Sequence, residues 1–533
     1  MKRRLVAMLT ASAMAVCMLA GCGAKSQTEE NDQKGIQSTV QQNDTGEIKT
    51  GGTMKYAAYA VVSTTGYTPE ITNNSGLLYL TAAYESLTTY DEEGNIAPNL
   101  ATEWTVDAEE PSITWTLREN VSFADGEPFN AEAVKRNIEE YQSCERNETA
   151  NIASCEVIDD THLKMVLEHW DSSTLEAVGF FVYYMSPKAL EDVDSLRNSS
   201  CGTGPFQVTE FESGVYAKYE KNENYWQEGK PYLDGIEIDI IDDPTTRAKA
   251  FEAGEYDIMD SNNLAVVNDL LGKGEYVIES NASGQGLAIT GLIPNSADED
   301  SPFAKAEVRR ALGYALDSEA ICEAFGYGML TTTDQWGTEN AVTYNKEIET
   351  VGYDPEKAKE LLAAAGYPDG FDTKITTTAA SKDMMTAVAG MLEQVGIRCQ
   401  VDLVDGSALT NLYSTGTWDG LMEHFAAISP DLGLYMGRHL DYDGAFYAKG
   451  IQHPDEAMEL LEKIRTAPTE EEKVQLEHEM QELLYNAEDG LYVFGKPIYI
   501  QNDPVLKYDY VINDNRCKYH VSTWTPAECW LNK

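Results

Sequence analysis

Three side chains in the second half of this chain carry groups that could hold a ligand. Asp431 could accept a charge-assisted hydrogen bond from an ammonium, and the planar guanidinium of Arg438 could bind a carboxylate. Trp336 could stack on a ligand. Each has a plainer interpretation, because a tryptophan is often a core residue and an arginine often lies at the surface. These residue types indicate binding, and we expect a ligand site that includes all three.

The sequence contains no arrangement that is typical of catalysis. Both Gly-x-Ser-x-Gly and His-Glu-x-x-His are absent. The seven histidines are scattered, although His424 and His439 flank the loop after Trp418 and could meet at a cleft. We therefore expect a binding protein with no catalytic residue, no cofactor and no protein-held metal. A metal or haem role for the two histidines and a secreted hydrolase are the alternatives.

The N-terminus has the pattern of an export signal. Three basic residues at positions 2–4 precede an apolar run that ends at residue 19, which is too short to span a bilayer comfortably. The following Ala20-Gly21-Cys22 completes a stretch that resembles the lipobox of bacterial lipoproteins. That resemblance implies cleavage before Cys22, lipid on its sulfur, and a chain anchored on the extracytoplasmic face of the cell membrane. Residues 1–21 are thus interpreted as a signal peptide and 22–51 as a flexible tether; an ordinary secreted protein is the alternative.

Cysteine spacing suggests one disulfide. Nine cysteines are present, and Cys144 and Cys155 are close enough in sequence to pair, as are Cys517 and Cys529. Connectivity cannot be deduced from sequence alone. Because Cys144 ends a helix that starts near Asn130 and Cys155 lies in the next strand, we predict a Cys144–Cys155 disulfide.

The charge balance excludes one class of partner. The chain has 39 Lys and Arg against 89 Asp and Glu, for a net charge of −50. A nucleic-acid-binding protein needs a basic surface, and no basic stripe is present in the sequence. The acidity favours solubility, and we expect no nucleic acid partner.

Strand and helix signals alternate along the body of the chain. Asp354-Pro355 is a helix start, with Gly366 as the stop. A strand near residues 374–376, a helix over 381–395 and a strand from Ile397 to Leu403 predict a β-α-β unit with parallel strands. Thr469 to Glu472 is a capping box that opens another helix. Short strands dominate the first half, so we predict a mixed α/β protein with two lobes of different character.

Several motifs in order resemble one known family. The stretch from Tyr84 to Ala131 is similar to the signature region of the family 5 solute-binding proteins of ABC transporters, the oligopeptide, dipeptide and nickel group. Later matches follow in the family's order: Gly202-Thr203-Gly204-Pro205-Phe206, Arg247 to Asp257, Pro302-Phe303 with Val308-Arg309-Arg310-Ala311, Tyr353 to Tyr367, and Trp418-Asp419.

The resemblance implies an architecture. It is the bilobal periplasmic-binding-protein-like fold (class II, large, dipeptide-binding-protein type), with two lobes joined by a hinge. Lobe I is expected over 52–285, lobe II over 286–500, and a return to lobe I over 501–533. The crossing strands are expected near residues 286–294 and 493–501, with the ligand between the lobes.

The resemblance also implies a function. It is the extracytoplasmic solute-binding component of an ABC importer, a monomer that captures a peptide-like solute and delivers it to the membrane permease. A nickel chelate, haem or oligosaccharide is the alternative ligand. Trp418 joins the expected site because the family has an aromatic residue there. The family's peptide binders use an acid before a proline to grip the amino terminus, whereas Asp431 here follows Pro430, which puts a standard dipeptide grip in doubt.

Overall fold

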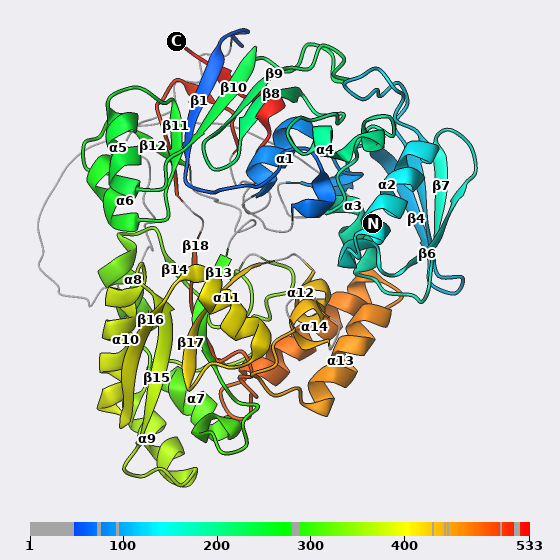
Figure 1. Cartoon of the computed structure of the whole chain (residues 1–533). Coiled ribbons are helices and arrows are strands. Elements are labelled where there is room, and N and C mark those ends of the chain that lie inside the picture. The colour runs from blue at the N-terminus through cyan, green and yellow to red at the C-terminus, as the bar shows by residue number, and fades with distance from the viewer. Residues whose placement is uncertain are drawn as a thin grey trace, which may run out of the picture. The chain divides into compact units, whose positions relative to one another are not determined.

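Two large sheets organise the chain in the computed structural model, which describes residues 47–71, 76–91, 95–279, 288–339, 341–428, 431–441, 444, 447–501, 504–515 and 523–533 (Figure 1). The first sheet is mixed. At its centre β1 runs parallel to β10 and β11, and the C-terminal strand β19 pairs with β11 in the antiparallel sense. Its strands, in spatial order, are β12 (Val277–Glu279), β19 (Val505–Lys507), β11 (Ile258–Asp260), β1 (Thr53–Ala58), β10 (Gly235–Ile240), β9 (Tyr216–Lys221) and β8 (Phe206–Glu212).

The second large sheet contains the predicted β-α-β unit. Strands β15 and β16 are parallel, and α10 connects them, which confirms the expectation from the apolar pattern of this region. The strands, in spatial order, are β14 (Thr331–Thr332), β18 (Lys496–Gln501), β13 (Ala288–Pro294), β17 (Leu421–Ala427), β15 (Phe371–Thr378) and β16 (Ile397–Val404).

A four-stranded antiparallel sheet shares one apolar core with the seven-stranded sheet. Trp115 of the smaller sheet and Tyr56 of the larger one are both fully buried in that core. The strands, in spatial order, are β4 (Ala101–Asp107), β5 (Ser112–Leu117), β7 (His162–Leu167) and β6 (Ile152–Val157). Two strand pairs are smaller: β2 (Thr88–Tyr90) with β3 (Ile96–Pro98), and β20 (Val511–Ile512) with β21 (Trp530–Leu531). We call the part built on this core lobe I, and the part built on the six-stranded sheet lobe II.

Helices begin where their capping residues predict. Asp354 accepts a hydrogen bond from the Lys357 amide and starts α9, and Thr469 does the same for Glu472 at the start of α14. The α-helices of the described ranges are α1 (Leu77–Ala83), α2 (Ala131–Ser143), α3 (Thr174–Phe180), α4 (Val193–Leu196), α5 (Pro244–Glu252), α6 (Leu264–Leu271), α7 (Ala306–Tyr314), α8 (Ser318–Gly326), α9 (Pro355–Ala364), α10 (Lys382–Gln394), α11 (Gly406–Thr415), α12 (Leu432–Leu440), α13 (Asp455–Thr466) and α14 (Glu470–Tyr485).

The chain changes sheet twice. It leaves the seven-stranded sheet after Glu279 and enters the six-stranded sheet at Ala288. It returns between Gln501, the last residue of β18, and Val505, the first residue of β19. Because three residues can bridge only about 14 Å between the flanking Cα atoms, this end of the six-stranded sheet lies next to lobe I. We call it the crossing end.

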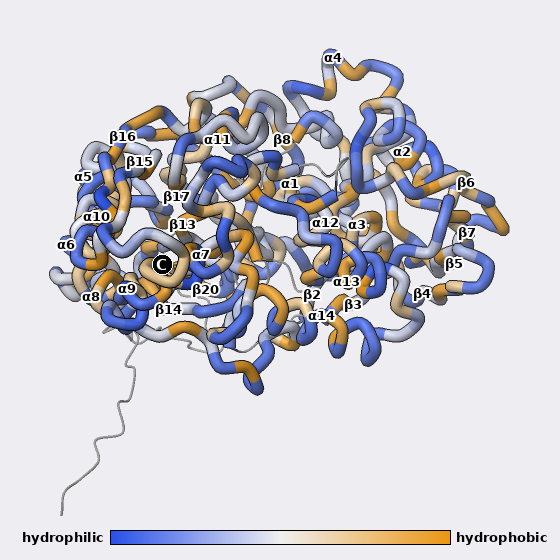
Figure 2. Tube along the Cα trace, turned by 90° about the horizontal axis from the view of Figure 1, so that it is seen from below, coloured by the Kyte–Doolittle hydropathy of each residue, from blue (hydrophilic) through white to orange (hydrophobic). Residues whose placement is uncertain are grey.

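Apolar side chains fill both faces of the six-stranded sheet. One cluster includes Met422 and Met436 and the other includes Leu292 and Ile375. Apolar and hydrophilic residues alternate along the chain (Figure 2). Among the helices that the structure describes, none has the length and apolarity that a membrane crossing requires.

The Gly202–Gly204 loop explains one sequence motif. A Cβ atom at Gly202 would lie 2.2 Å from the Ala83 carbonyl oxygen, so only glycine allows this close approach. Between the two glycines, the Thr203 hydroxyl donates to Glu85 at 2.8 Å. The loop therefore packs two distant motifs together, which is a structural role.

The predicted Cys144–Cys155 disulfide is wrong. Both residues are free thiols, and the sulfur of Cys144 lies 3.1 Å from the Tyr67 hydroxyl. Cys155 is on β6, opposite Met165 of β7. Proximity in sequence did not bring the two sulfurs together because the end of α2 packs toward Tyr67. Cys22, Cys517, the expected signal peptide and most of the expected tether lie outside the described residues.

Candidate functional site

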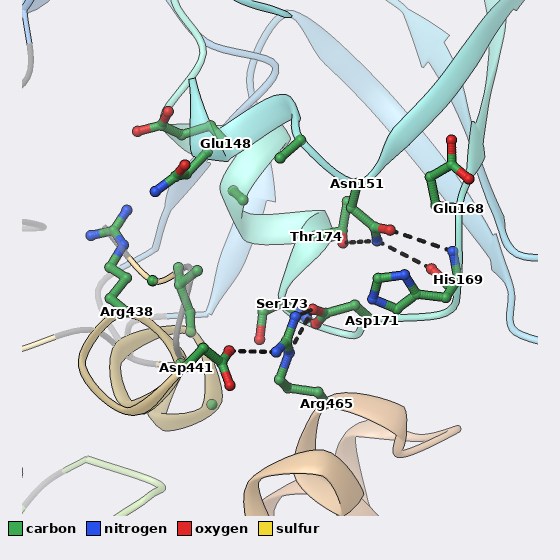
Figure 3. A pocket seen from close by; sticks show the side chains of 17 residues that line it. Glu148, Asn151, Glu168, His169, Asp171, Ser173, Thr174, Arg438, Asp441 and Arg465 are labelled. Carbon is green, nitrogen blue, oxygen red and sulfur yellow. Dashed lines mark hydrogen bonds and ion pairs between the residues drawn. The ribbon is translucent and has the colours of Figure 1, made fainter. Parts of the chain in front are cut away.

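A pocket of about 300 Å³ lies between the two lobes (Figure 3). That volume is at the lower end of the usual range for small-molecule sites. Lobe I contributes residues before and within α3, and lobe II contributes residues of α12, α13 and the segment after α12. The lining residues are Asn147, Glu148, Ala150, Asn151, Glu168, His169, Asp171, Ser173, Thr174 and Ala177 from lobe I, with Gly433, Leu434, Gly437, Arg438, Asp441, Gly444 and Arg465 from lobe II.

Arg465 connects the lobes at one wall of this pocket. Its Nη2 atom lies 2.5 Å from Asp171 of lobe I, and its Nη1 atom lies 2.5 Å from Asp441 of lobe II (Figure 3). Burial, the largest single effect, lowers the pKa of Arg465, but the Asp171 and Asp441 carboxylates and Glu462 together outweigh it and raise the pKa. The guanidinium therefore stays charged and neutralises two carboxylates, one from each lobe.

Three further hydrogen bonds join the same segments. The Ser172 amide donates to the Arg465 carbonyl at 2.7 Å, and the Ser172 hydroxyl donates to the Ile464 carbonyl at 3.2 Å. The Trp170 indole donates to the Ala467 carbonyl at 3.0 Å. We call this set of contacts, together with the Arg465 ion pairs, the clasp.

Arg438 brings a positive charge to the pocket. Its guanidinium lies over the Phe181 ring at 5.0 Å and has no ion pair or hydrogen bond to any residue of the described ranges. Figure 3 shows the side chain extending from α12 on the same side as Glu148. The Glu148 carboxylate is held by Arg146 at 2.7 Å, so it does not neutralise Arg438. The guanidinium is thus available to bind an anionic group. The expected role of Arg438, binding of a ligand carboxylate, stays a prediction.

Asp431 has a different role from the expected one. Its carboxylate accepts from the Leu434 amide at 2.7 Å and so caps α12. It also forms an ion pair with Lys473 at 2.6 Å, and both side chains are less than a tenth exposed. The ammonium that Asp431 binds is therefore an internal one. A ligand ammonium could not replace it without leaving Lys473 buried and unpaired.

Glu477 completes this buried network. It accepts hydrogen bonds from the amides of Leu432 and Gly433 at 2.9 and 3.3 Å. Burial, and then the negative charge of Asp431, raises the pKa of Glu477 to about 8. Burial, the largest single effect, opposes the charge on Lys473, but Asp431 and the neighbouring acids Glu477 and Glu470 together outweigh it and raise the pKa of Lys473. At neutral pH the network thus holds a charged Lys473 and a protonated Glu477.

The raised pKa of Glu477 predicts a pH-dependent stability. Between its ordinary pKa near 4.5 and a folded-state pKa of about 8, the folded chain keeps a proton that the unfolded chain has released. The contribution of Glu477 to stability is therefore present at low pH and lost as pH rises, by about 1.4 kcal/mol per pH unit. Glu477→Gln keeps an acceptor for the two amides and should remove this slope.

The measurement is urea unfolding of both proteins across the range from about pH 5 to about pH 8. Glu482→Gln, an exposed position on the same helix, is the control and should retain the wild-type slope. Parallel stability curves for wild type and Glu477→Gln would contradict the assignment of this proton to Glu477.

The two expected tryptophans lie in the core of lobe II. Trp336 is 4% exposed, and its ring centroid lies 4.8 Å from that of Tyr435. Trp418 is 3% exposed and stacks on Tyr413 at 6.1 Å. Neither indole nitrogen has a hydrogen-bond partner in the part of the chain that the structure describes. The core interpretation of Trp336 fits this environment, and neither tryptophan lines the pocket.

His424 and His439 do meet, but inside lobe II. Their ring centroids are 5.7 Å apart, and His439 Nδ1 lies 2.5 Å from the Tyr413 hydroxyl. Burial lowers the pKa of His424 to about 4 and lowers that of His439 as well, so both rings are neutral at neutral pH. Among the described residues, no group of three or more His, Cys, Asp or Glu is arranged to hold a metal ion.

Sequence reasoning missed the clasp. Asp171 and Arg465 are separated by 294 positions, and neither belongs to a local motif that indicates its partner. Asp171 follows β7, and Arg465 lies near the end of α13. Charged residues are common at helix ends, so their presence there did not indicate an ion pair between the lobes.

Comparison with known proteins gives consistent results. A family model described as "Bacterial extracellular solute-binding proteins, family 5 Middle" matches residues 95–447. The nickel-binding periplasmic protein of Escherichia coli (strain K12) is 29% identical over 338 residues, which cover 59% of this chain and 64% of that protein. The glutathione-binding protein GsiB of Salmonella typhi is 28% identical over 335 residues, which cover 60% and 64%. The chain therefore matches slightly less than two thirds of the length of these relatives.

Solved structures show the same fold. The ABC transporter-associated periplasmic binding protein DppA from Helicobacter pylori, in complex with the peptide STSA, matches with a TM-score of 0.74 and 23% identity. The match covers 91% of this chain and 99% of that one. The predicted dipeptide-binding-protein type of α/β fold is thus confirmed.

Proposed function

Because this chain belongs to the bacterial extracellular solute-binding proteins of family 5, we propose that it is the solute-binding component of an ABC importer. In this role it captures a solute between lobe I (residues 52–285 and 501–533) and lobe II (residues 286–500) and delivers it to the membrane permease. The observation that carries the proposal is the pocket, which both lobes line and the clasp borders. A pocket at such an interface suits binding followed by lobe opening, without a chemical step.

The proposed solute is peptide-like and carries a carboxylate. Arg438 supplies an unpaired guanidinium at the pocket, and Asn151 and His169 of lobe I add polar groups to the pocket lining. A guanidinium matches the two oxygens of a carboxylate. The amino terminus of a peptide is not held by Asp431, because Lys473 occupies that carboxylate. The relatives are named for nickel and glutathione, and a nickel chelate, haem or oligosaccharide is the alternative ligand.

Mass spectrometry of solutes that copurify with the chain, followed by calorimetry, tests this assignment. We expect Arg438→Met to weaken binding of the recovered solute about 10- to 100-fold, because a hydrogen bond to a charged group contributes about 1.5–3 kcal/mol. Arg398→Met is the control, since Arg398 is exposed and pairs with Asp372 on another part of lobe II. Equal affinity in wild type and Arg438→Met would show that the solute does not bind at Arg438. Recovery of an uncharged sugar would refute the peptide-like solute and leave the transport role standing.

We also propose that the chain is anchored through lipid on Cys22, on the evidence of the sequence around that residue, and that it acts as a monomer, as the family resemblance implies. In a bacterial host, wild type should fractionate with membranes and Cys22→Ala should be released. If the variant stays with the membrane as firmly as wild type, the lipid anchor is refuted.

A further inference from the structure

The contact between Arg438 and Phe181 joins the two lobes. Arg438 is on α12 of lobe II, and its guanidinium carbon lies 5.0 Å from the centroid of the Phe181 ring of lobe I. This distance is within the range of a cation–π interaction. Phe181 directly follows α3 and is half-buried. The contact therefore exists only while the lobes are as close together as in this structure.

Helices α3 and α12 face each other across the pocket. Ser173 and Ala177 line the pocket and precede Phe181 by eight and four residues, which places the three on one side of the α3 segment. On α12, Arg438 lines the pocket from the other lobe. Near the start of both helices, the Ser173 hydroxyl donates to Asp431 at 3.3 Å. The hydrogen bond and the cation–π contact thus join the two helices near both of their ends.

The core of lobe I fixes the position of the Phe181 ring. The neighbouring Phe180 is 5% exposed, and its ring packs edge-on against that of Phe181 with the centroids 5.0 Å apart. The next two residues, Val182 and Tyr183, are buried in the core of lobe I. The ring is therefore a fixed aromatic surface, which the Arg438 side chain of lobe II meets when the lobes close.

This aromatic surface leaves the hydrogen-bond donors of Arg438 available. A guanidinium stacks on an aromatic ring through its face and donates hydrogen bonds in its plane, where it has five N–H groups. None of them donates to a residue of the described ranges. A carboxylate can accept two of them side by side. Without the ring, the long arginine side chain would keep more rotamers, and the entropy lost on ordering it would oppose binding.

We propose that Phe181 is a positioning residue for Arg438, which fixes the guanidinium for a solute carboxylate and does so only when the lobes are closed. This inference rests on the proposed solute-binding function and adds a residue of lobe I to it. Because the ring and the cation belong to different lobes, the carboxylate is bound more strongly in the closed form. A bound carboxylate in turn favours closure. Solutes without a carboxylate lack this coupling, so the chain discriminates against them.

Two probes that differ only in the carboxylate test the proposal. The affinities for trialanine and for trialanine amide are measured by calorimetry on wild type, Phe181→Leu, Phe181→Tyr and a control, Phe211→Leu. Phe211 is also a half-buried phenylalanine of lobe I, but it is on β8 and does not line the pocket. We expect wild type and the control to bind trialanine about tenfold or more tightly than the amide.

Phe181→Leu should reduce this preference about two- to fivefold, the contribution of a partly exposed cation–π contact. Phe181→Tyr keeps an aromatic ring and should retain the preference. A defect of folding or of lobe closure alone would lower the affinity for both probes by the same factor. In Arg438→Met the preference should be near one, and adding Phe181→Leu should not change it, because no guanidinium is left to position.

The outcomes separate this inference from the proposed function. An unchanged preference in Phe181→Leu, or an equal loss of affinity for both probes, refutes the positioning role and leaves the proposed function intact. Equal binding of both probes by wild type refutes the carboxylate site at Arg438 together with this inference, and binding of neither probe also refutes the peptide-like solute. Thermal unfolding of each variant identifies a folding defect. If Phe181→Leu has one, Phe181→Met, which keeps more of the side-chain volume, should show the same reduced preference.

Discussion

Lys473→Met is expected to lower the free energy of unfolding by about 3–5 kcal/mol, because removal of one partner leaves a buried charge uncompensated. The Lys473 and Asp431 side chains are 7% and 4% exposed, and their ion pair measures 2.6 Å. Glu477, also buried, adds a second carboxyl group next to the lost cation. Methionine retains most of the side-chain volume, so the expected loss reflects the charge and not a cavity.

Urea unfolding measures this loss. Lys359→Met, which removes an exposed partner of Glu356, is the matched control and should change stability by about 0.5 kcal/mol or less. In Asp431→Asn/Lys473→Met, asparagine still caps α12 while the buried negative charge is gone, so we expect the double variant to recover much of the stability. A loss in Lys473→Met no greater than in the control would show that Asp431 is hydrated or otherwise compensated in the folded chain.

Local signals made much of the fold predictable. Asp354 and Thr469 start helices where they were expected, because a capping side chain bonds amides only two or three residues away. The β15-α10-β16 unit was predictable because its three elements are consecutive in sequence. Apolar residues recur with a period of two in the strands and 3.6 in the helix. Such features depend on neighbours in sequence.

The site depended on distant residues and was less predictable. Asp431 has the right chemistry for a ligand ammonium, but Lys473 comes from a helix 42 positions later and takes that carboxylate. Trp336 and Trp418 have the right chemistry for stacking on a ligand, but both pack in the apolar core of lobe II. Arg438, expected as a carboxylate partner, does line the pocket. Residue type predicts what a side chain can bind, while burial and tertiary partners decide what it does bind.

Arg465→Met is expected to shift the equilibrium between closed and open lobes by about 3 kcal/mol or more toward the open form. The reason is that Asp171 is 6% exposed, and without Arg465 it faces Asp441 of the other lobe with no cation between them. Like charges then repel across the interface that the clasp now holds together. A shift of that size corresponds to a factor of about 150 in the population ratio, and the affinity for solute falls as the binding-competent population falls.

Small-angle scattering and calorimetry measure the two consequences. The radius of gyration of ligand-free Arg465→Met should exceed that of wild type, and its affinity for the solute should be lower. Arg398→Met is the control; it breaks only an exposed ion pair and should change neither quantity. Asp171→Asn/Asp441→Asn/Arg465→Met removes the repulsion together with the attraction, so part of the affinity should return. Since the Ser172 and Trp170 hydrogen bonds to residues 464–467 remain in every variant, unchanged scattering and affinity in Arg465→Met would mean that these backbone contacts alone keep the lobes together.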